Sequence, residues 1–319
     1  RRRMVAMTPP ATLPPDTARR ARRRRSSRLP YALLAPSIVI LLLAAGYPLG
    51  RQLVMSLQEY GLAQQFGQPA EWVGLGNYVE LVTDPYLWAV VARSIVFCLV
   101  NAALTMAIGV AIAVLMTQLS NATRLILQIG LLLAWAMPIL ASLTVWQWLF
   151  DTQYGVINWV LSNVFGLEQF AGRSWLINPL SFYFVATMII VWMSVPFVAF
   201  SVYAGLTQVP TDILEAAQID GASGWQRFRA ITVPMIKPVL LIVGLLQIIW
   251  DLRVFTQIFV LQDAGGVARD TNLIGTYIYR LGIGEGQFGL AAAASWFILA
   301  LTVAVSFFYV RVLLREEQP

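Results

Sequence analysis

Long apolar runs separated by short polar segments dominate the pattern of this 319-residue chain. A helix needs about 20 apolar residues to cross roughly 30 Å of hydrocarbon. Strands that alternate apolar and polar residues over about ten positions, as in outer-membrane barrels, are not seen in the sequence. The pattern therefore predicts an all-α membrane protein with six transmembrane helices, at about residues 31–57, 87–118, 125–150, 179–204, 238–261 and 287–314.

The composition agrees, since 58% of the residues are hydrophobic and 12% are charged, whereas a soluble domain has about 25% charged residues. There is no histidine, and Cys98 is the only cysteine. Structural zinc sites, intrachain disulfides, cysteine–histidine nucleophiles and histidine proton switches are therefore excluded. Few general bases remain and no acidic dyad is evident, so the sequence does not favour an intramembrane enzyme.

Basic residues indicate the orientation of the chain. Ten of the 22 lie before Tyr31, and the positive-inside rule then places the N-terminus in the cytoplasm. Residues 1–28 have few large apolar side chains and are expected to form a disordered basic cytoplasmic tail. Residues 29–319 follow as one six-helix membrane domain, whose first apolar run is long enough to remain as an anchor rather than a cleaved signal peptide. The net charge of +6 is attributed to this topology and not to nucleic-acid binding.

A polar insert on the predicted cytoplasmic side separates the fourth and fifth crossings. Asp212 is followed three residues later by Glu215, which fits a capping box and predicts a helix beginning near Ile213. At Asp220-Gly221 the glycine can take the positive φ that ends a helix and turns the chain. The insert is therefore expected to begin with a short helix and a tight turn.

A second short helix is predicted directly after this turn. Ser223 and Gln226 form a second capping box. One apolar stripe follows at spacings of three, formed by Trp225, Phe228 and Ile231. Pro234 is expected to end the helix, because Val233 is disfavoured in helical geometry before proline.

The residues alone leave two interpretations of this hairpin open. Ala216, Ala217 and Ala222 leave its surface nearly bare around the turn, so that the backbone of another protein could approach closely. An ordinary amphipathic connector that rests on the membrane has the same features, and one capped hairpin does not decide between them.

Three motifs in the insert nevertheless resemble a known family. E-A-A at 215–217, D-G-A at 220–222 and F-x-x-I-T-x-P at 228–234 closely resemble the EAA loop of bacterial ABC importer permeases. WVGLGNY, GGVARDTNLIGTYIYRLG and FGLAAAASW are similar to the maltose and glycerol-3-phosphate branch of carbohydrate permeases. The resemblance covers about residues 30–314. It implies the type I ABC importer permease fold in a bacterial inner membrane, with a cytoplasmic coupling loop at about 205–237.

The resemblance also implies partners and roles. In this family the EAA loop docks on an ATPase subunit, and the corresponding positions here are Glu215, Ala216, Ala217, Asp220, Gly221, Ala222, Trp225 and Phe228. The chain has no G-x-x-x-x-G-K-[ST] phosphate loop, so it is expected to be non-catalytic and free of cofactors, with ATP and Mg bound by the partner. Expected partners are two copies of the ATPase subunit, a second, paralogous permease of the maltose-importer type, an extracytoplasmic sugar-binding protein and membrane lipid.

Sugar contacts in the maltose-type permease lie on the crossings on either side of the EAA loop. The matching positions here are Ile190, Met193, Ser194, Phe197, Leu246, Ile249, Trp250 and Arg253. The asparagines that hold sugar hydroxyls in that relative are absent, and a sugar would instead stack on Trp250 and hydrogen-bond Arg253. The implied cargo is a di- or oligosaccharide or a related carbohydrate, with an anionic saccharide left open.

Polar side chains in the fifth crossing are functional candidates in their own right. Gln247 with Asp251, and Arg253 with Gln257, are each four residues apart and could meet on a helix face. Partners on a neighbouring helix are an equal alternative to substrate contact. In the sixth crossing the small residues 291–294 indicate close helix packing.

One rival function belongs to a different class of transporter. An ion-coupled secondary carrier for a small polar solute would need a charged or unwound site at the membrane midplane and usually has paired halves, neither of which is evident in the sequence.

Overall fold

The computed structural model describes residues 29–316, which fall into two units divided between Val54 and Met55. The first unit is helical, and Pro30–Ser56 is long and apolar enough to cross a membrane, as predicted for the first crossing. The tail predicted at residues 1–28 lies outside the described part of the chain. The elements of this region are α2 (Leu29–Leu41), the π-helical turn η1 (Leu42–Gly46) and α3 (Tyr47–Ser56).

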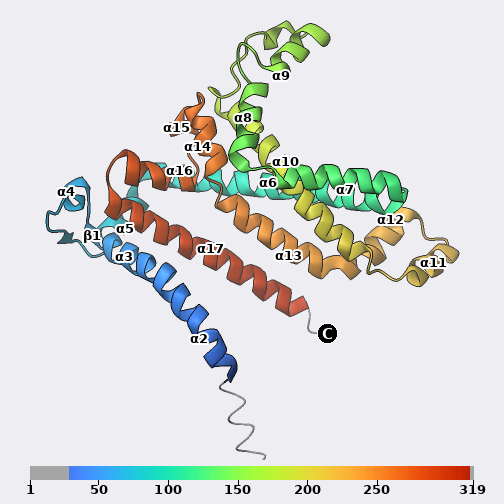
Figure 1. Cartoon of the computed structure of the whole chain (residues 1–319), viewed down its shortest axis with the longest axis horizontal. Helices are drawn as coiled ribbons and strands as arrows, with labels where there is room; N and C mark the ends of the chain where they lie inside the picture. Colours follow the sequence, from blue (N-terminus) through green and yellow to red (C-terminus); the bar gives the residue numbers. More distant parts are fainter. Residues whose placement is uncertain (1–28, 317–319) are drawn as a thin grey trace, which may run out of the picture. The chain divides into compact units, whose positions relative to one another are not determined.

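The second unit is built around three long helices, α6 (Pro85–Gln118), α10 (Pro179–Leu206) and α13 (Val233–Leu252). The pair formed by α6 and α10 is the most extensive, and α13 packs against both (Figure 1). Gly109 of α6 allows this approach, because a Cβ atom there would lie 2.5 Å from Val198 Cγ1 of α10. The second and fourth predicted crossings are confirmed as α6 and α10.

The sixth predicted crossing is confirmed as α17 (Phe288–Glu316). Ala291, Ala292, Ala293 and Ala294 are all buried at its start. Three of them pack in a cluster with Leu81, from the segment before α6. The small-residue run therefore packs closely, as the sequence predicts.

The third predicted crossing, residues 125–150, is not one straight helix. It consists of α7 (Asn121–Ala136) and α8 (Ile139–Leu149), bent by 99° at the break between them (Figure 1). The bend follows from Pro138, which cannot donate a helical hydrogen bond and forces Met137 into an extended conformation with φ −67° and ψ 130°. The described residues therefore hold five candidate spans, and the bent pair supplies the sixth.

The fifth predicted crossing, residues 238–261, is interrupted near its end. α13 stops at Leu252, and α14 (Thr256–Asp263) begins after a three-residue break. Val254, inside the break, is buried in the same core cluster as Phe182 of α10. This contact with a distant segment cannot be seen in the local pattern.

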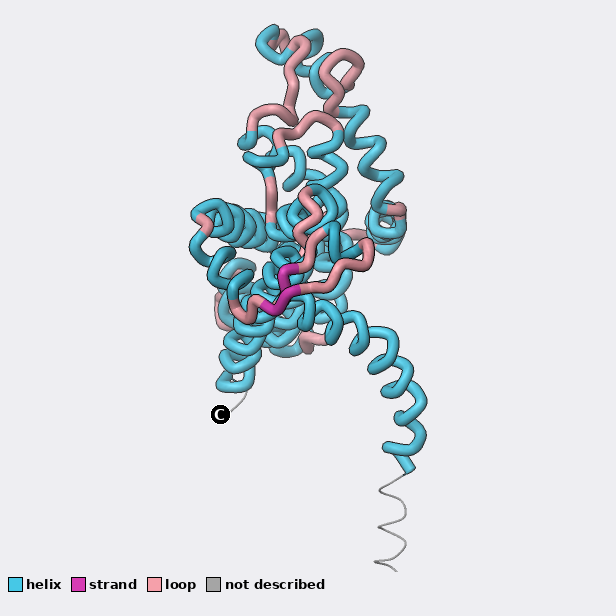
Figure 2. The backbone as a smooth tube through the Cα atoms, turned by 90° about the vertical axis from the view of Figure 1, so that its left-hand side faces the viewer, coloured by secondary structure: helices cyan, strands magenta, loops and turns pink. Residues whose placement is uncertain are grey.

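Short elements outside the long helices complete the second unit. A two-residue antiparallel pair, with Gln58 opposite Trp72, was not predicted from the sequence and is visible as the two strands in Figure 2. The elements are β1 (Gln58–Glu59), α4 (Leu62–Gln65), β2 (Glu71–Trp72), α5 (Gly76–Thr83), α9 (Val156–Trp159), η2 (Val160–Val164), η3 (Glu168–Phe170), α15 (Ala268–Thr271), α16 (Ile274–Tyr279) and η5 (Arg280–Gly284).

Candidate coupling hairpin and membrane path

The polar insert forms the predicted hairpin, made of α11 (Thr211–Ile219) and α12 (Gly224–Arg227). Gly221 has φ +84°. The Ala222 amide donates to the Ala217 carbonyl at 2.9 Å, and the Gly221 amide donates to the Gln218 carbonyl at 3.1 Å. These two bonds form a Schellman motif, which closes a helix on a left-handed glycine. The predicted turn is confirmed.

The second helix starts with the predicted capping box. The Gln226 amide donates to Ser223 Oγ at 3.3 Å, and the Ser223 amide donates to Gln226 Oε1 at 2.7 Å. The structure also shows a bond that was not predicted. Arg227 Nη1 donates to Gln218 Oε1 at 2.8 Å across the turn. This bond fastens α12 to α11, so the hairpin is held by side chains as well as by its turn.

The capping box predicted at Asp212 and Glu215 is wrong. No side chain caps the start of α11, which is described along its whole length, and the residue before it is Pro210, with φ −62° and ψ 131°. Because proline fixes φ near this value, the change from extended to helical backbone falls at Pro210. Asp212 then lies inside the first turn, where its negative charge interacts favourably with the positive end of the helix dipole. Glu215 is exposed to solvent.

The end predicted for the second helix at Pro234 is also wrong. The helical path runs from α12 through the π-helical turn η4 (Phe228–Thr232) directly into α13, and Val233 is helical with φ −58° and ψ −47°. A proline inside an α-helix removes one hydrogen bond and its ring clashes with the carbonyl four residues earlier. The wider π-helical turn immediately before Pro234 changes that register, so the proline is accommodated at the start of α13.

The predicted ATPase-contact residues lie on this hairpin and, for Phe228, at the first residue of η4. Glu215, Ala216, Asp220, Gly221 and Trp225 are exposed, whereas Ala217, Ala222 and Phe228 are half-buried. The rings of Trp225 and Phe228 are stacked with centroids 5.7 Å apart, although Trp225 is 68% exposed.

One residue of this surface was missed by the sequence analysis. Ile219, the last residue of α11, is 87% exposed at the turn. The only sequence signal for it is an apolar residue directly before the D-G-A motif. With Trp225 it gives the end of the hairpin an apolar surface beside its polar one, as docking surfaces often have.

The predicted path residues lie on α10 and α13, and the structure brings some of them together. Phe197 and Trp250 meet edge to face, with ring centroids 5.0 Å apart, and Trp250 is 45% exposed. Met193, Ser194, Leu246 and Ile249 are half-buried, and Arg253 is exposed at the end of α13.

Ile190 does not join this group. It is 2% exposed and belongs to the core cluster that includes Ile258 of α14. In this conformation it offers no surface to a solute, because α14 folds back over α10 after the break that the sequence pattern did not reveal.

The polar residues of the fifth crossing behave in two ways. Gln247 Nε2 donates to both carboxylate oxygens of Asp251 at 3.0 Å, and both side chains are buried, so this predicted pair is confirmed. Arg253 and Gln257 do not meet on a helix face, because α13 ends at Leu252 and the two residues do not share a helix.

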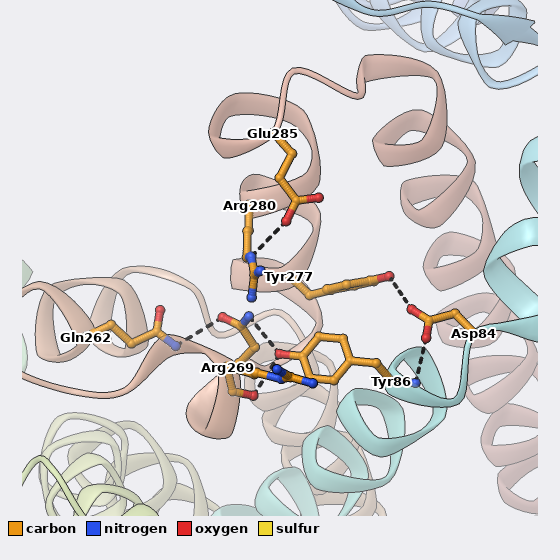
Figure 3. A network of polar contacts seen from close by, with 8 residues as sticks. Asp84, Tyr86, Gln262, Arg269, Tyr277, Arg280 and Glu285 are labelled. Atoms are coloured by element: carbon orange, nitrogen blue, oxygen red, sulfur yellow. Dashed lines mark hydrogen bonds and ion pairs between the residues drawn. The ribbon is translucent and has the colours of Figure 1, made fainter.

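A polar network on the predicted outer side ties the start of α6 to the segment between α14 and α17 (Figure 3). Asn272 Nδ2 donates to the Tyr86 hydroxyl at 3.0 Å, and Asn272 Oδ1 accepts from Gln262 Nε2 at 3.2 Å. The Tyr86 hydroxyl in turn donates to the Arg269 carbonyl at 2.8 Å. Asn272 is only 1% exposed, so its side-chain amide depends on these two partners rather than on water.

The same network includes the phenol of Tyr277. Its hydroxyl donates to Asp84 Oδ2 at 3.4 Å (Figure 3). Burial, together with the nearby Asp84 carboxylate, raises the pKa of Tyr277 to about 12, so the phenol stays protonated and remains a donor at neutral pH. Beyond it, Arg280 Nε and Glu285 Oε1 form an exposed ion pair at 2.9 Å. No local pattern indicated the bond between Tyr277 and Asp84, because these residues are 193 positions apart in the chain.

The fold and the hairpin define a polytopic membrane protein with a rigid, water-facing element between two of its crossings. Within residues 29–316, no group of three or more histidine, cysteine, aspartate or glutamate residues is placed to hold a metal ion. Residues 106–316 match the family described as the binding-protein-dependent transport system inner membrane component. The match covers more than half of the chain, which therefore belongs to this family of transporter permeases.

Relatives over nearly the whole chain agree. The chain is 39% identical over 302 residues to the diacetylchitobiose uptake system permease protein DasB of Streptomyces coelicolor, covering 95% of this chain and 92% of that protein. It is 30% identical over 288 residues to the trehalose/maltose transport system permease protein MalF of Thermococcus litoralis, covering 90% and 94%. These relatives belong to the sugar-uptake branch that the sequence motifs resemble, and they give no support to the ion-coupled carrier.

A solved structure shows the same fold. A chain of a bacterial alginate ABC transporter, determined in complex with an alginate pentasaccharide-bound periplasmic protein, superposes with a TM-score of 0.79 at 21% identity. The match covers 95% of this chain and 99% of that one. The type I ABC importer permease fold predicted from the sequence is confirmed.

Proposed function

We propose that this permease imports a carbohydrate and receives its driving force through the α11–α12 hairpin. ATP binding would close a pair of ATPase subunits, draw the hairpins of two permeases together, and switch the helix bundle between inward-open and outward-open states. The observation that carries the proposal is the construction of the hairpin. It is exposed, yet it is fixed by a Schellman turn, a capping box and the Arg227–Gln218 bond, so it can transmit a push without folding away.

The partners follow from this mechanism. The chain would pair with a second permease, bind two copies of a cytoplasmic ATPase that hold ATP and Mg, and accept sugar from an extracytoplasmic binding protein. The chain itself would catalyse no reaction. This proposal places the hairpin and both termini in the cytoplasm, in agreement with the basic residues that precede the first crossing.

The sugar would pass between α10 and α13. Trp250 is partly exposed and held edge to face by Phe197, which suits an aromatic platform for the apolar face of a sugar ring. Arg253 is exposed one turn further along and would donate hydrogen bonds to hydroxyl or carboxylate oxygens. We propose Met193, Ser194, Phe197, Leu246, Ile249, Trp250 and Arg253 as the path, and a di- or oligosaccharide or related carbohydrate as the cargo.

Retention of the ATPase tests the coupling proposal. The chain is co-expressed with candidate ATPase subunits, solubilised in detergent, and the ATPase that co-purifies is quantified for wild type, Glu215→Lys and Gly221→Pro. We expect the wild type to retain the ATPase and both variants to lose it, because one reverses a charge on the contact surface and the other removes the left-handed turn.

Glu71→Lys is the matched control for the charge reversal. Glu71 is also exposed but lies in β2, away from the hairpin, so this variant should retain the ATPase like the wild type. Equal retention by the wild type and both hairpin variants, with all chains eluting as folded protein, would show that the hairpin is only a connector.

A further inference from the structure

An apolar groove runs along α6, α7 and α10. It is a hollow of about 810 Å³ with almost entirely apolar walls, which include Ile112, Ile126 and Val195. Gly130 of α7 lines it, and a Cβ atom added there would meet nothing within 4 Å. The groove is therefore open at this point, and a larger side chain there would project into it.

A polar cavity of about 580 Å³ is lined by later turns of α6 and α10, by the first turn of α7 and by the hairpin. Thr117 follows Ile112 on α6, Tyr203 follows Val195 on α10, and Arg124 precedes Ile126 on α7. On all three helices the polar cavity therefore lies at the end proposed to be cytoplasmic, and the apolar groove lies deeper in the membrane. The order along the chain is reversed on α7 because that helix runs in the opposite direction.

Two guanidinium groups make this cavity attractive to an anion. Arg124 lies 6.0 Å above the ring of Tyr203, and Arg227 projects from the hairpin. Arg227 Nε is buried without a hydrogen-bond partner. The residues that line the cavity include no carboxylate, and within the described part of the chain neither arginine forms an ion pair. Two positive charges are therefore left without a counter-charge.

From this arrangement we propose that the groove binds a phospholipid with an anionic head group. The head-group phosphate lies between Arg124 and Arg227, where it accepts charge-assisted hydrogen bonds, and an acyl chain lies along the apolar groove past Gly130. A free phosphate would satisfy the arginines but would leave the adjoining apolar hollow unused. The lipid requires both halves, and the three helices that line the groove continue into the polar cavity, where the hairpin adds Arg227.

The site has a mechanical consequence that does not depend on which sugar is carried. Arg124 belongs to the membrane bundle, whereas Arg227 is the residue that fastens α12 to α11. A bound phosphate therefore joins the bundle to the hairpin through two ionic contacts.

Lipid binding is measured directly. The full-length chain is purified in detergent with whatever subunits accompany it, and native mass spectrometry follows the binding of dioctanoyl phosphatidylglycerol, dioctanoyl phosphatidylcholine and inorganic phosphate. The variants are Arg124→Gln, which removes one charge, and Gly130→Leu, which fills the groove. Arg229→Gln, an exposed arginine of η4 outside the cavity, is the matched control.

We expect the wild type and Arg229→Gln to bind phosphatidylglycerol with equal affinity, more tightly than phosphatidylcholine. Arg124→Gln should bind it about tenfold more weakly, the effect of losing one charge-assisted hydrogen bond. Gly130→Leu should weaken the binding of both lipids without changing the yield or the thermal unfolding midpoint of the protein.

Two results would overturn the proposal. Competition by inorganic phosphate as strong as that of the lipid, with no effect of Gly130→Leu, would indicate a free-anion pocket. Equal binding of both lipids, or no difference between Arg124→Gln and Arg229→Gln, would show that the arginines do not bind the head group. Neither result depends on ATPase retention, so the proposed function is tested separately.

Discussion

The α11–α12 hairpin and the polar network around Asn272 are both held by hydrogen bonds, but the bonds span very different distances along the chain. In the hairpin, the capping box joins residues three apart and the Arg227–Gln218 bond joins residues nine apart. In the network, Asn272 and Tyr86 are 186 residues apart, and Tyr277 and Asp84 are 193 apart. The hairpin is thus a local structure, and the network is a product of the assembled bundle.

This difference also determines how much each bond should contribute to the free energy of unfolding. The hairpin is largely exposed, so water can replace a bond that is removed. Asn272 is buried, and a partner left unpaired there keeps its full desolvation cost. Variants should therefore rank by burial and backbone strain rather than by bond length.

Asn272→Ala should have the largest effect. It removes one hydrogen bond each from the Tyr86 hydroxyl and Gln262 Nε2, which keep the Arg269 carbonyl and Thr271 Oγ1 as partners. We expect the free energy of unfolding to fall by about 2 kcal/mol, the sum of two net hydrogen bonds. Thermal unfolding followed by tryptophan fluorescence measures this. Tyr86→Phe and the double variant complete a cycle in which the combined loss should be smaller than the sum. A strictly additive result would mean that the two side chains do not act together.

Gly221→Ala should come next. The φ of +84° lies in the left-handed region, and no neighbour lies within 4 Å of the added Cβ, so the cost is backbone strain alone, about 1–2 kcal/mol. Hydrogen exchange should accelerate at the Ala222 amide, whose bond closes the turn, while the outer network keeps its protection. Faster exchange throughout the chain would contradict the local character of the hairpin.

Ser223→Ala should cost about 1 kcal/mol, because it removes the side-chain half of the capping box at α12. Ser223→Gly is the matched control and should lose only a few tenths of a kcal/mol, since glycine is itself a good N-cap. Limited proteolysis in the hairpin gives the readout. If the alanine and glycine variants are cleaved at the same rate, the cap contributes nothing.

Arg280→Gln should have the smallest effect, below about 1 kcal/mol, because exposed ion pairs are weakened by water and salt. The Arg280–Glu285 pair leaves 43% and 35% of its side chains accessible. The thermal midpoint should barely change, and any change should vanish at high salt. A large, salt-independent loss would show that this pair is part of the buried network.

Much of the fold could be predicted from apolar run lengths, since a helix in hydrocarbon must satisfy its own backbone groups and needs a minimum length. The positions at which the helices break were harder to predict from the sequence. The bend at Pro138 has a local cause that the hydropathy pattern ignored, whereas the break before α14 accompanies burial of Val254 in a core cluster shared with α10. Pro234 was misjudged because the π-helical turn before it relieves the usual clash.

The sequence by itself determined the membrane-spanning character, the turn at Gly221 and the second capping box, because these depend on the nature of residues within a few positions of one another. The tertiary structure alone decided that Phe197 meets Trp250, that Ile190 is buried in the core, and that Arg124 and Arg227 share one cavity. Those outcomes depend on how helices far apart in the chain pack together, and side-chain volumes and unpaired charges become meaningful only when their neighbours are known.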